Sequence, residues 1–158
     1  MTDGRGPTPS IGAAHERPDG VSDATVAATG KVGEALEWVE RARGHLYEFH
    51  QMMGHADFLF GDAADALRTA GHATLAELLC TEIVGRNVLD GRWTFQMVEE
   101  FDDCYYEPVR AVERRVRDEC VAGRRHVFEA ELKERRHTHG HPAHAREPAG
   151  CDTETRPR

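Results

Sequence analysis

The sequence has little lysine, a net negative charge and no long hydrophobic run, and the last two features each argue against a class of partner. Only two of the 20 basic residues are lysines, Lys31 and Lys133, and the net charge is −8 with neutral histidines. A chain that binds nucleic acid usually carries a clustered basic face, so we expect no nucleic-acid partner. No apolar run approaches the ~18 residues that a membrane-spanning helix needs, so we expect no membrane partner.

Paired cysteines and catalytic motifs are missing as well. The four cysteines are scattered without a C-x-x-C pair, at Cys80, Cys104, Cys120 and Cys151. This spacing argues against a zinc–cysteine site and predicts reduced thiols, and nothing resembles a signal peptide, so we expect a cytoplasmic protein. The sequence contains no G-x-S-x-G, P-loop or dinucleotide fingerprint. We therefore expect a protein that is not an enzyme.

Composition divides the chain into three parts. Residues 1–29 and 137–158 are rich in small residues and proline, and their apolar residues recur with no sustained period. This composition predicts disorder at both ends. The second of these segments is also rich in histidine. Residues 30–136 show a helical period throughout and no strand pattern, which predicts an all-α domain.

One apolar stripe dominates the predicted domain. From Ala35 to Ala70 the chain can be counted in alternating steps of four and three, and every position reached is apolar. Such a heptad pattern is typical of a coiled-coil helix, here of ~36 residues. The positions are Ala35, Val39, Ala42, Leu46, Phe49, Met53, Ala56, Phe60, Ala63, Leu67 and Ala70.

A turn and further helices follow the stripe. Gly71 fits the position after a helix end, and Thr74 with Glu77 matches a capping box. The same four–three steps continue over 74–107 and favour a continuous or merely kinked helix, although glycines at 85–91 threaten it. Pro108 fits the first turn of another helix. The sequence thus predicts a long antiparallel helical hairpin plus one or two further helices, as a three- to four-helix bundle.

Three histidines at intervals of five stand on the first predicted helix, at His45, His50 and His55. Steps of five turn by about 140° net around a helix, so the three cannot bind one ion together. His45 lies in a row seven residues from Trp38 and Met52, beside the apolar stripe. We therefore predict that His45 is the buried one.

The predicted hairpin places His45 opposite Glu100, with Glu48 three residues after His45. The alternative function is consequently a ferritin-like metal-binding bundle, with storage or oxidase chemistry, in which these three residues hold an ion. The metal would be Fe, Mn, Zn or Ni. The same helices also suggest a buried polar network that needs no metal. Its members are Glu82, Arg86 and Gln96.

Two further sites remain open. The histidine-rich tail, with His137, His139 and His141, could capture a transition-metal ion or simply be solvated. A small-ligand pocket could be lined by aromatic residues, namely Trp38, Trp93, Tyr105 and Tyr106. The function that the pattern favours most is non-catalytic self-association or partner docking. A third segment of under 30 residues cannot cover two long helices, so we expect a homodimer or a helical protein partner.

Overall fold

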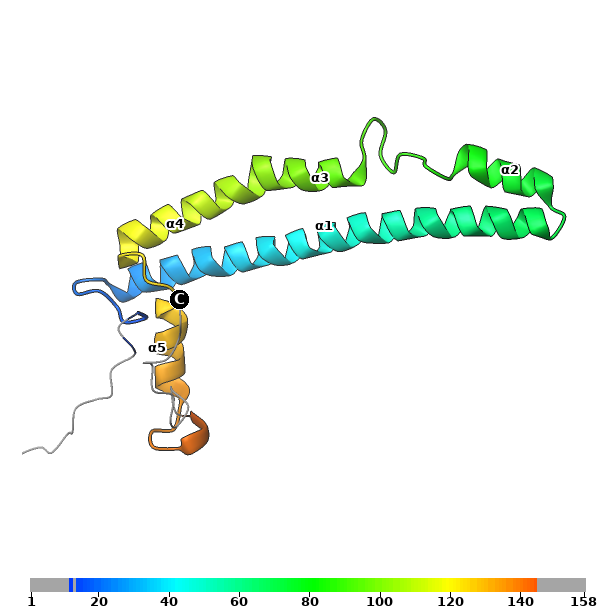
Figure 1. Cartoon of the computed structure of the whole chain (residues 1–158). Helices are drawn as coiled ribbons and strands as arrows, with labels where there is room; N and C mark the ends of the chain where they lie inside the picture. Colours follow the sequence, from blue (N-terminus) through cyan, green and yellow to red (C-terminus); the bar gives the residue numbers. More distant parts are fainter. Residues whose placement is uncertain (1–11, 13, 145–158) are drawn as a thin grey trace, which may run out of the picture. The chain divides into compact units, whose positions relative to one another are not determined.

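Helices make up most of the described chain, as predicted. The structure is a computed structural model that describes residue 12 and residues 14–144 (Figure 1), and no strand occurs among them. No helix of this part of the chain combines the length and apolar character needed to span a membrane. The elements in order are α1 (Asp23–Thr69), α2 (Ala73–Glu82), α3 (Thr94–Phe101), the π-helix η1 (Asp102–Tyr106), α4 (Glu107–Val121), α5 (Val127–Arg136) and the 3-10 helix η2 (Pro142–His144).

The chain divides into two compact units. The central unit is Lys31–Val116, and the terminal unit consists of the residues up to Gly30 together with those from Arg117 onward. Helices α1 and α4 each contribute residues to both units.

The predicted boundary of the N-terminal segment differs from the structure, whereas the predicted end of the helical domain agrees with it. Helix α1 begins at Asp23, because Ser22 caps it by accepting a hydrogen bond from the Thr25 amide at 3.2 Å. The predicted segment 1–29 is therefore too long, and its residues 1–11 and 13 lie outside the described part. Helix α5 ends at Arg136, where the domain was predicted to end, and residues 145–158 of the predicted tail also lie outside it.

The terminal unit has a small valine core. Val26 of α1, Val121 of α4 and Val127 of α5 are all buried and pack together. Arg17 joins the segment before α1 to α5, since its guanidinium donates to both Glu131 carboxylate oxygens at 2.6 and 2.7 Å. Sequence reasoning missed this contact because the two residues lie far apart in the chain.

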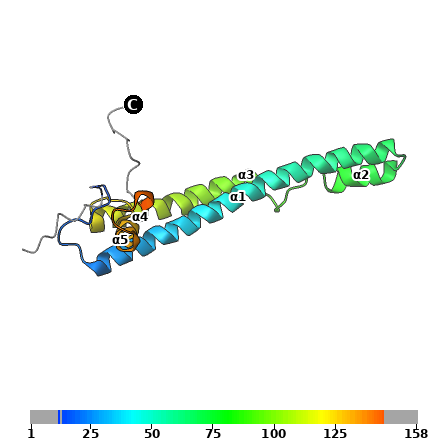
Figure 2. The ribbon, with the colours of Figure 1, turned by 90° about the horizontal axis from the view of Figure 1, so that it is seen from below.

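In the central unit, α1 is paired with the segment that follows it. Figures 1 and 2 both show α2 and α3 alongside α1. Three hydrogen bonds show the direction of the pairing. Asp57 contacts Gly85, His50 contacts Thr94, and Arg43 contacts Asp102, so residue numbers fall along α1 as they rise along the second segment. The pairing is therefore antiparallel between these stretches.

The prediction of one helix over 74–107 is wrong. Helix α2 ends at Glu82 and α3 begins at Thr94, and the chain between them is not helical. Gly85 and Gly91 adopt positive φ of 75° and 68°, which other residues rarely tolerate. The predicted capping box is not formed either, because α2 starts at Ala73 without a side-chain cap. Gly71 does have the predicted left-handed conformation, with φ of 88°.

The helix from α3 to α4 passes through a π-helical turn at Asp102–Tyr106. The amide of Glu107 donates to the Asp102 carbonyl, five residues back, just before Pro108. Proline has no amide hydrogen, so an α-helical bond is lost at this point, and the wider turn accommodates the loss. Pro108 thus lies in the first turn of α4, as predicted, without a separate helix start.

The first prediction concerns a close approach in the terminal unit. A Cβ atom at Gly30 would lie 2.9 Å from the Phe128 Cβ, whereas one at Gly33 would meet nothing within 4 Å. Both glycines lie within α1, where alanine stabilises a helix by about 0.5–1 kcal/mol relative to glycine. Gly33→Ala should raise the free energy of unfolding in denaturant titrations, and Gly30→Ala should lower it. Equal gains for both variants would contradict the packing of Phe128 against α1.

Candidate functional site

A row of polar side chains on α1 faces the second segment of the central unit. Arg43, His50 and Asp57 stand seven residues apart, and all three are partly buried. The row begins at Arg43, whose guanidinium donates two hydrogen bonds to Asp102, at 2.7 and 2.8 Å.

The other two members of the row bond near the interruption between α2 and α3. The His50 Nδ1 lies 2.7 Å from the Thr94 hydroxyl, at the start of α3. The Asp57 carboxylate accepts a bond from the Gly85 amide at 2.7 Å. Each partly buried polar group thus has a partner, which offsets its loss of water.

The π-helix places two residues at the Arg43 end of this row. The bonds from Arg43 hold the pKa of Asp102 below the value of an ordinary aspartate. Tyr106 is buried, and its hydroxyl donates to Glu40 at 2.6 Å, which raises the pKa of Tyr106. The guanidinium of Arg43 also lies over the Tyr106 ring, 4.7 Å from its centre.

This row shows that the predicted orientation of α1 is wrong. The apolar stripe was expected to face inward along its whole length, but Ala35, Ala42 and Ala63 are exposed. His45, predicted to be buried, has a side chain that is 80% exposed, whereas His50 is the histidine that contacts the second segment. About its own axis, α1 is oriented so that Arg43, His50 and Asp57 face the second segment, and the row of His45 does not.

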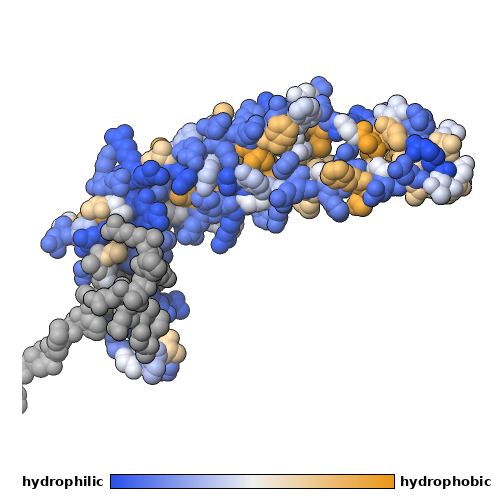
Figure 3. Space-filling view, in the orientation of Figure 1, coloured by the Kyte–Doolittle hydropathy of each residue, from blue (hydrophilic) through white to orange (hydrophobic). Residues whose placement is uncertain are grey.

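A second heptad stripe of α1 is left on the surface, and we call it the α1 seam. Trp38, Met52 and Leu59 are 61%, 61% and 53% exposed. Phe49 and Ala56 are partly buried, and the other members are exposed. In Figure 3, apolar side chains reach the surface over α1 and the chain between α2 and α3. The seam consists of Ala35, Trp38, Ala42, His45, Phe49, Met52, Ala56, Leu59, Ala63 and Ala66.

The structure brings only two of the predicted metal ligands of the helices together. The His45 Nδ1 lies 3.1 Å from a Glu48 oxygen, and both side chains are exposed. Glu100 instead forms an ion pair with Arg92, six positions beyond Arg86 of the predicted network. Metal binding by His45, Glu48 and Glu100 stays a prediction.

The predicted buried network is wrong about burial, since Glu82, Arg86 and Gln96 are all exposed. Arg86 donates to the backbone carbonyl of Glu82 at 3.3 Å, not to its carboxylate. The Gln96 side chain accepts a bond from the Trp93 amide at 3.0 Å and so caps α3. These residues lie beside or within the interruption that the sequence did not predict, which removed them from the expected interface.

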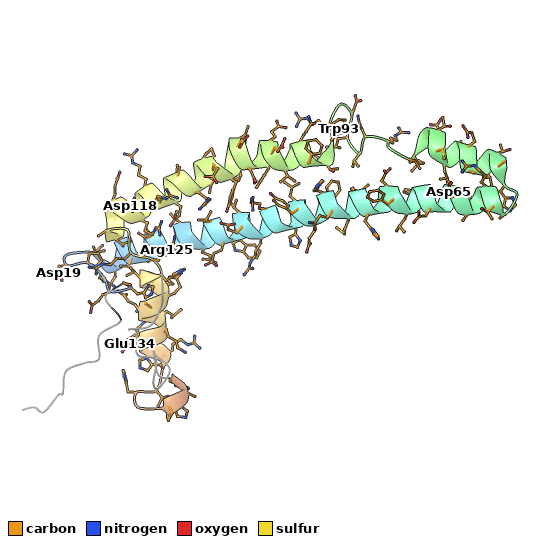
Figure 4. All side chains as sticks on the ribbon, viewed as in Figure 1. Asp19, Asp65, Trp93, Asp118, Arg125 and Glu134 are labelled. Carbon is orange, nitrogen blue, oxygen red and sulfur yellow. The ribbon has the colours of Figure 1, made fainter. Side chains whose placement is uncertain are left out.

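A cavity of about 470 Å³ lies beside the interruption between α2 and α3. Of the four aromatic residues predicted to line a pocket, only Trp93 lines this one, and Figure 4 shows Trp93 just before α3. Met53, Phe60 and Phe95 add apolar surface, and Asp57 lies at the same cavity. Most of the lining surface is apolar, although Arg86, Asn87 and Thr94 also line the cavity.

The tail histidines lie close to the end of α5. His137 and His139 have ring centres 4.3 Å apart, and Glu134 stands on the last turn of α5. His141 instead has its ring centre 4.5 Å from that of His144. Sequence reasoning missed Glu134, although Glu134 and His137 have the E-x-x-H spacing that ferritin-like bundles use to hold metal ions.

No known protein family, curated protein or solved structure matches the chain. The function must therefore be inferred from the geometry of these sites.

The second prediction concerns acid stability. The depressed pKa of Asp102 in the folded state contributes stability above its unfolded value of about 4, and this contribution is lost as pH falls through the folded value. Asp102→Asn should lower the free energy of unfolding by about 1–2 kcal/mol at pH 7. The difference from the unchanged protein should shrink below about pH 4 in urea titrations.

The matched control is Glu107→Gln, which disturbs an exposed ion pair with Arg110 three residues away. This variant should change stability little at any pH. A difference for Asp102→Asn that is the same at pH 3 and pH 7 would contradict the proposed link to Arg43.

Proposed function

We propose that the protein is a non-catalytic self-association module in which a second copy packs against the α1 seam. The observation that carries the proposal is the exposure of Trp38, Met52 and Leu59, which share one heptad row with His45. A heptad of exposed apolar residues is typical of a coiled-coil seam without its partner. Covering the exposed part of each of these side chains should contribute roughly 1–2 kcal/mol.

In this proposal the central unit is a long antiparallel helical hairpin. The ordered series of contacts from Asp57 with Gly85 to Arg43 with Asp102 supports it. These contacts use one side of α1 and leave the seam on another. Two hairpins joined through their seams would form a four-helix arrangement from two copies, whereas the sequence predicted a three- to four-helix bundle within one chain.

The alternation of large and small residues favours an antiparallel pair. With a two-fold axis beside residues 50 and 51, Trp38 meets Ala63 of the second copy, and Leu59 meets Ala42. Trp38 and Leu59 then each fit a hole that an alanine leaves, Phe49 meets Met52 beside the axis, and the small residues let the two helices approach closely. Two-fold symmetry uses the same surface on both copies, so the dimer is closed.

The charges beside the seam favour the same alignment. On the flank of the seam, Arg41 comes opposite Asp62 of the second copy, and Glu48 comes opposite His55. Symmetry repeats each pair, and all four side chains are exposed in the single chain. Sliding by one heptad in either direction opposes Glu48 to another acid instead, either Glu48 or Asp62 of the second copy. Charge complementarity therefore selects one alignment and opposes the neighbouring ones.

The third prediction tests the seam with two neighbouring residues. Leu59→Asp places a carboxylate in the proposed interface twice, so it should raise the dimer dissociation constant by at least about tenfold. Phe58 is 77% exposed but lies off the seam, so Phe58→Asp should leave the constant nearly unchanged. Sedimentation equilibrium measures both. A strictly monomeric protein at high micromolar concentration would refute self-association, and equal effects would refute the seam.

The fourth prediction tests the alignment by charge reversal. Arg41→Asp and Asp62→Arg should each weaken the dimer by about tenfold, because each opposes like charges across the interface. The double variant restores opposite charges and should recover most of the loss. A double variant weaker than either single variant would overturn this alignment, while the effect of Leu59→Asp would still report on the seam itself.

A further inference from the structure

We propose that Glu134, His137 and His139 form a binding site for one divalent late transition-metal ion, with Zn²⁺ as its representative. Each residue offers a ligand atom, and the three atoms all lie within 4.8 Å of one another. Glu134 stands near the end of α5, as Figure 4 shows, and His137 follows the helix directly. The helix therefore fixes one ligand and holds the next one beside it.

The hydrogen bonding of His137 suits a metal ligand. Its Nδ1 lies 3.3 Å from the Lys133 carbonyl oxygen and 3.6 Å from a Glu134 carboxylate oxygen, and both oxygens can accept a hydrogen bond when Nδ1 carries the hydrogen. The Nε2 atom then keeps its lone pair. Histidines that bind metals usually donate their other ring N–H to a carbonyl or carboxylate in this way, which sets the tautomer and orients the ring.

The donor set decides the class of ion. Two imidazoles and one carboxylate suit zinc, nickel or copper, whereas calcium and magnesium prefer oxygen ligands alone. The side chains of Glu134 and His137 are mostly covered, which strengthens their attraction for a cation relative to a solvated tail. Three protein ligands leave room for water or another group at the ion.

Other histidines of the same segment are bonded elsewhere. The His141 Nδ1 accepts a bond from the Ala143 amide at 3.2 Å, and the His144 Nδ1 accepts one from the Thr138 amide at 3.0 Å. The proposed site thus differs from the histidine tail expected from the sequence, because Glu134 replaces His141. This replacement is what an experiment can detect, since a flexible histidine tail would make no use of a carboxylate on α5.

The fifth prediction is tested with the full chain, kept reduced by a phosphine and titrated with Zn²⁺ against a chromophoric chelator. Removing a residue that only orients a metal ligand weakens metal affinity by about 10–100-fold. Removing a ligand itself should therefore weaken the affinity at least as much. Glu134→Gln, His137→Ala and His139→Ala should each lower the affinity of the tightest ion by at least about tenfold. His141→Ala, the matched control, should leave it nearly unchanged.

Co²⁺ titration supplies a second readout, because thiolate ligands give strong near-ultraviolet absorption and this site should give none. Far-ultraviolet circular dichroism checks that Glu134→Gln keeps the helix content of the unchanged protein. His139 lies beyond α5, so His139→Ala changes no residue of that helix. Unchanged affinity in Glu134→Gln, or equal losses in the variants of His137, His139 and His141, would show adventitious capture by the tail and overturn the proposal.

Discussion

The orientation of α1 depends on the need of three polar side chains for partners. Arg43, His50 and Asp57 share one face of the helix, and the second segment supplies a carboxylate, a hydroxyl and a backbone amide for them. Turning α1 by about 50° would aim the apolar stripe inward as first expected. It would also break all three contacts, and a partly buried polar group without a partner costs about 1–3 kcal/mol.

This constraint explains why so much apolar surface lies outside. With the polar row directed at the second segment, α1 keeps half of its apolar stripe for that contact, including Val39, Leu46 and Met53, which are partly buried. The remaining half joins Trp38 and Met52 on the outer side. One helix thus carries two different apolar faces, and only one of them is used within the chain.

Local patterns predicted the elements whose signals are local. The heptad spacing from Ala35 to Ala70 identified α1, Gly71 marked the turn after it, and the change of composition at Arg136 marked the end of α5. The rotation of α1 about its axis was not predictable in the same way, because two neighbouring heptad rows are both apolar. The choice between them depends on Asp102, which lies 59 residues from Arg43 in the chain.

The errors in the second segment have a different origin. Steps of four and three continued through 83–93, but such a pattern is necessary for a helix and does not ensure one. Gly85 and Gly91 adopt positive φ, and the helix is interrupted there despite the pattern. Arg17 and Glu131 lie 114 residues apart in the chain, so no local sequence pattern could predict their contact. Glu134 was different, because its E-x-x-H spacing to His137 is present in the sequence and was overlooked.

The shallow core has a thermodynamic consequence. In the described part of the chain, the largest side chain that is under 2% exposed is Val121, while the tryptophans remain mostly exposed. A single chain therefore gains limited stability from its own packing, and any contact that covers the outer face adds to it. In the proposed dimer, folding and assembly are linked by mass action. The melting temperature of such a protein is set partly by how much of it is present, so its abundance becomes one of the variables that hold it folded.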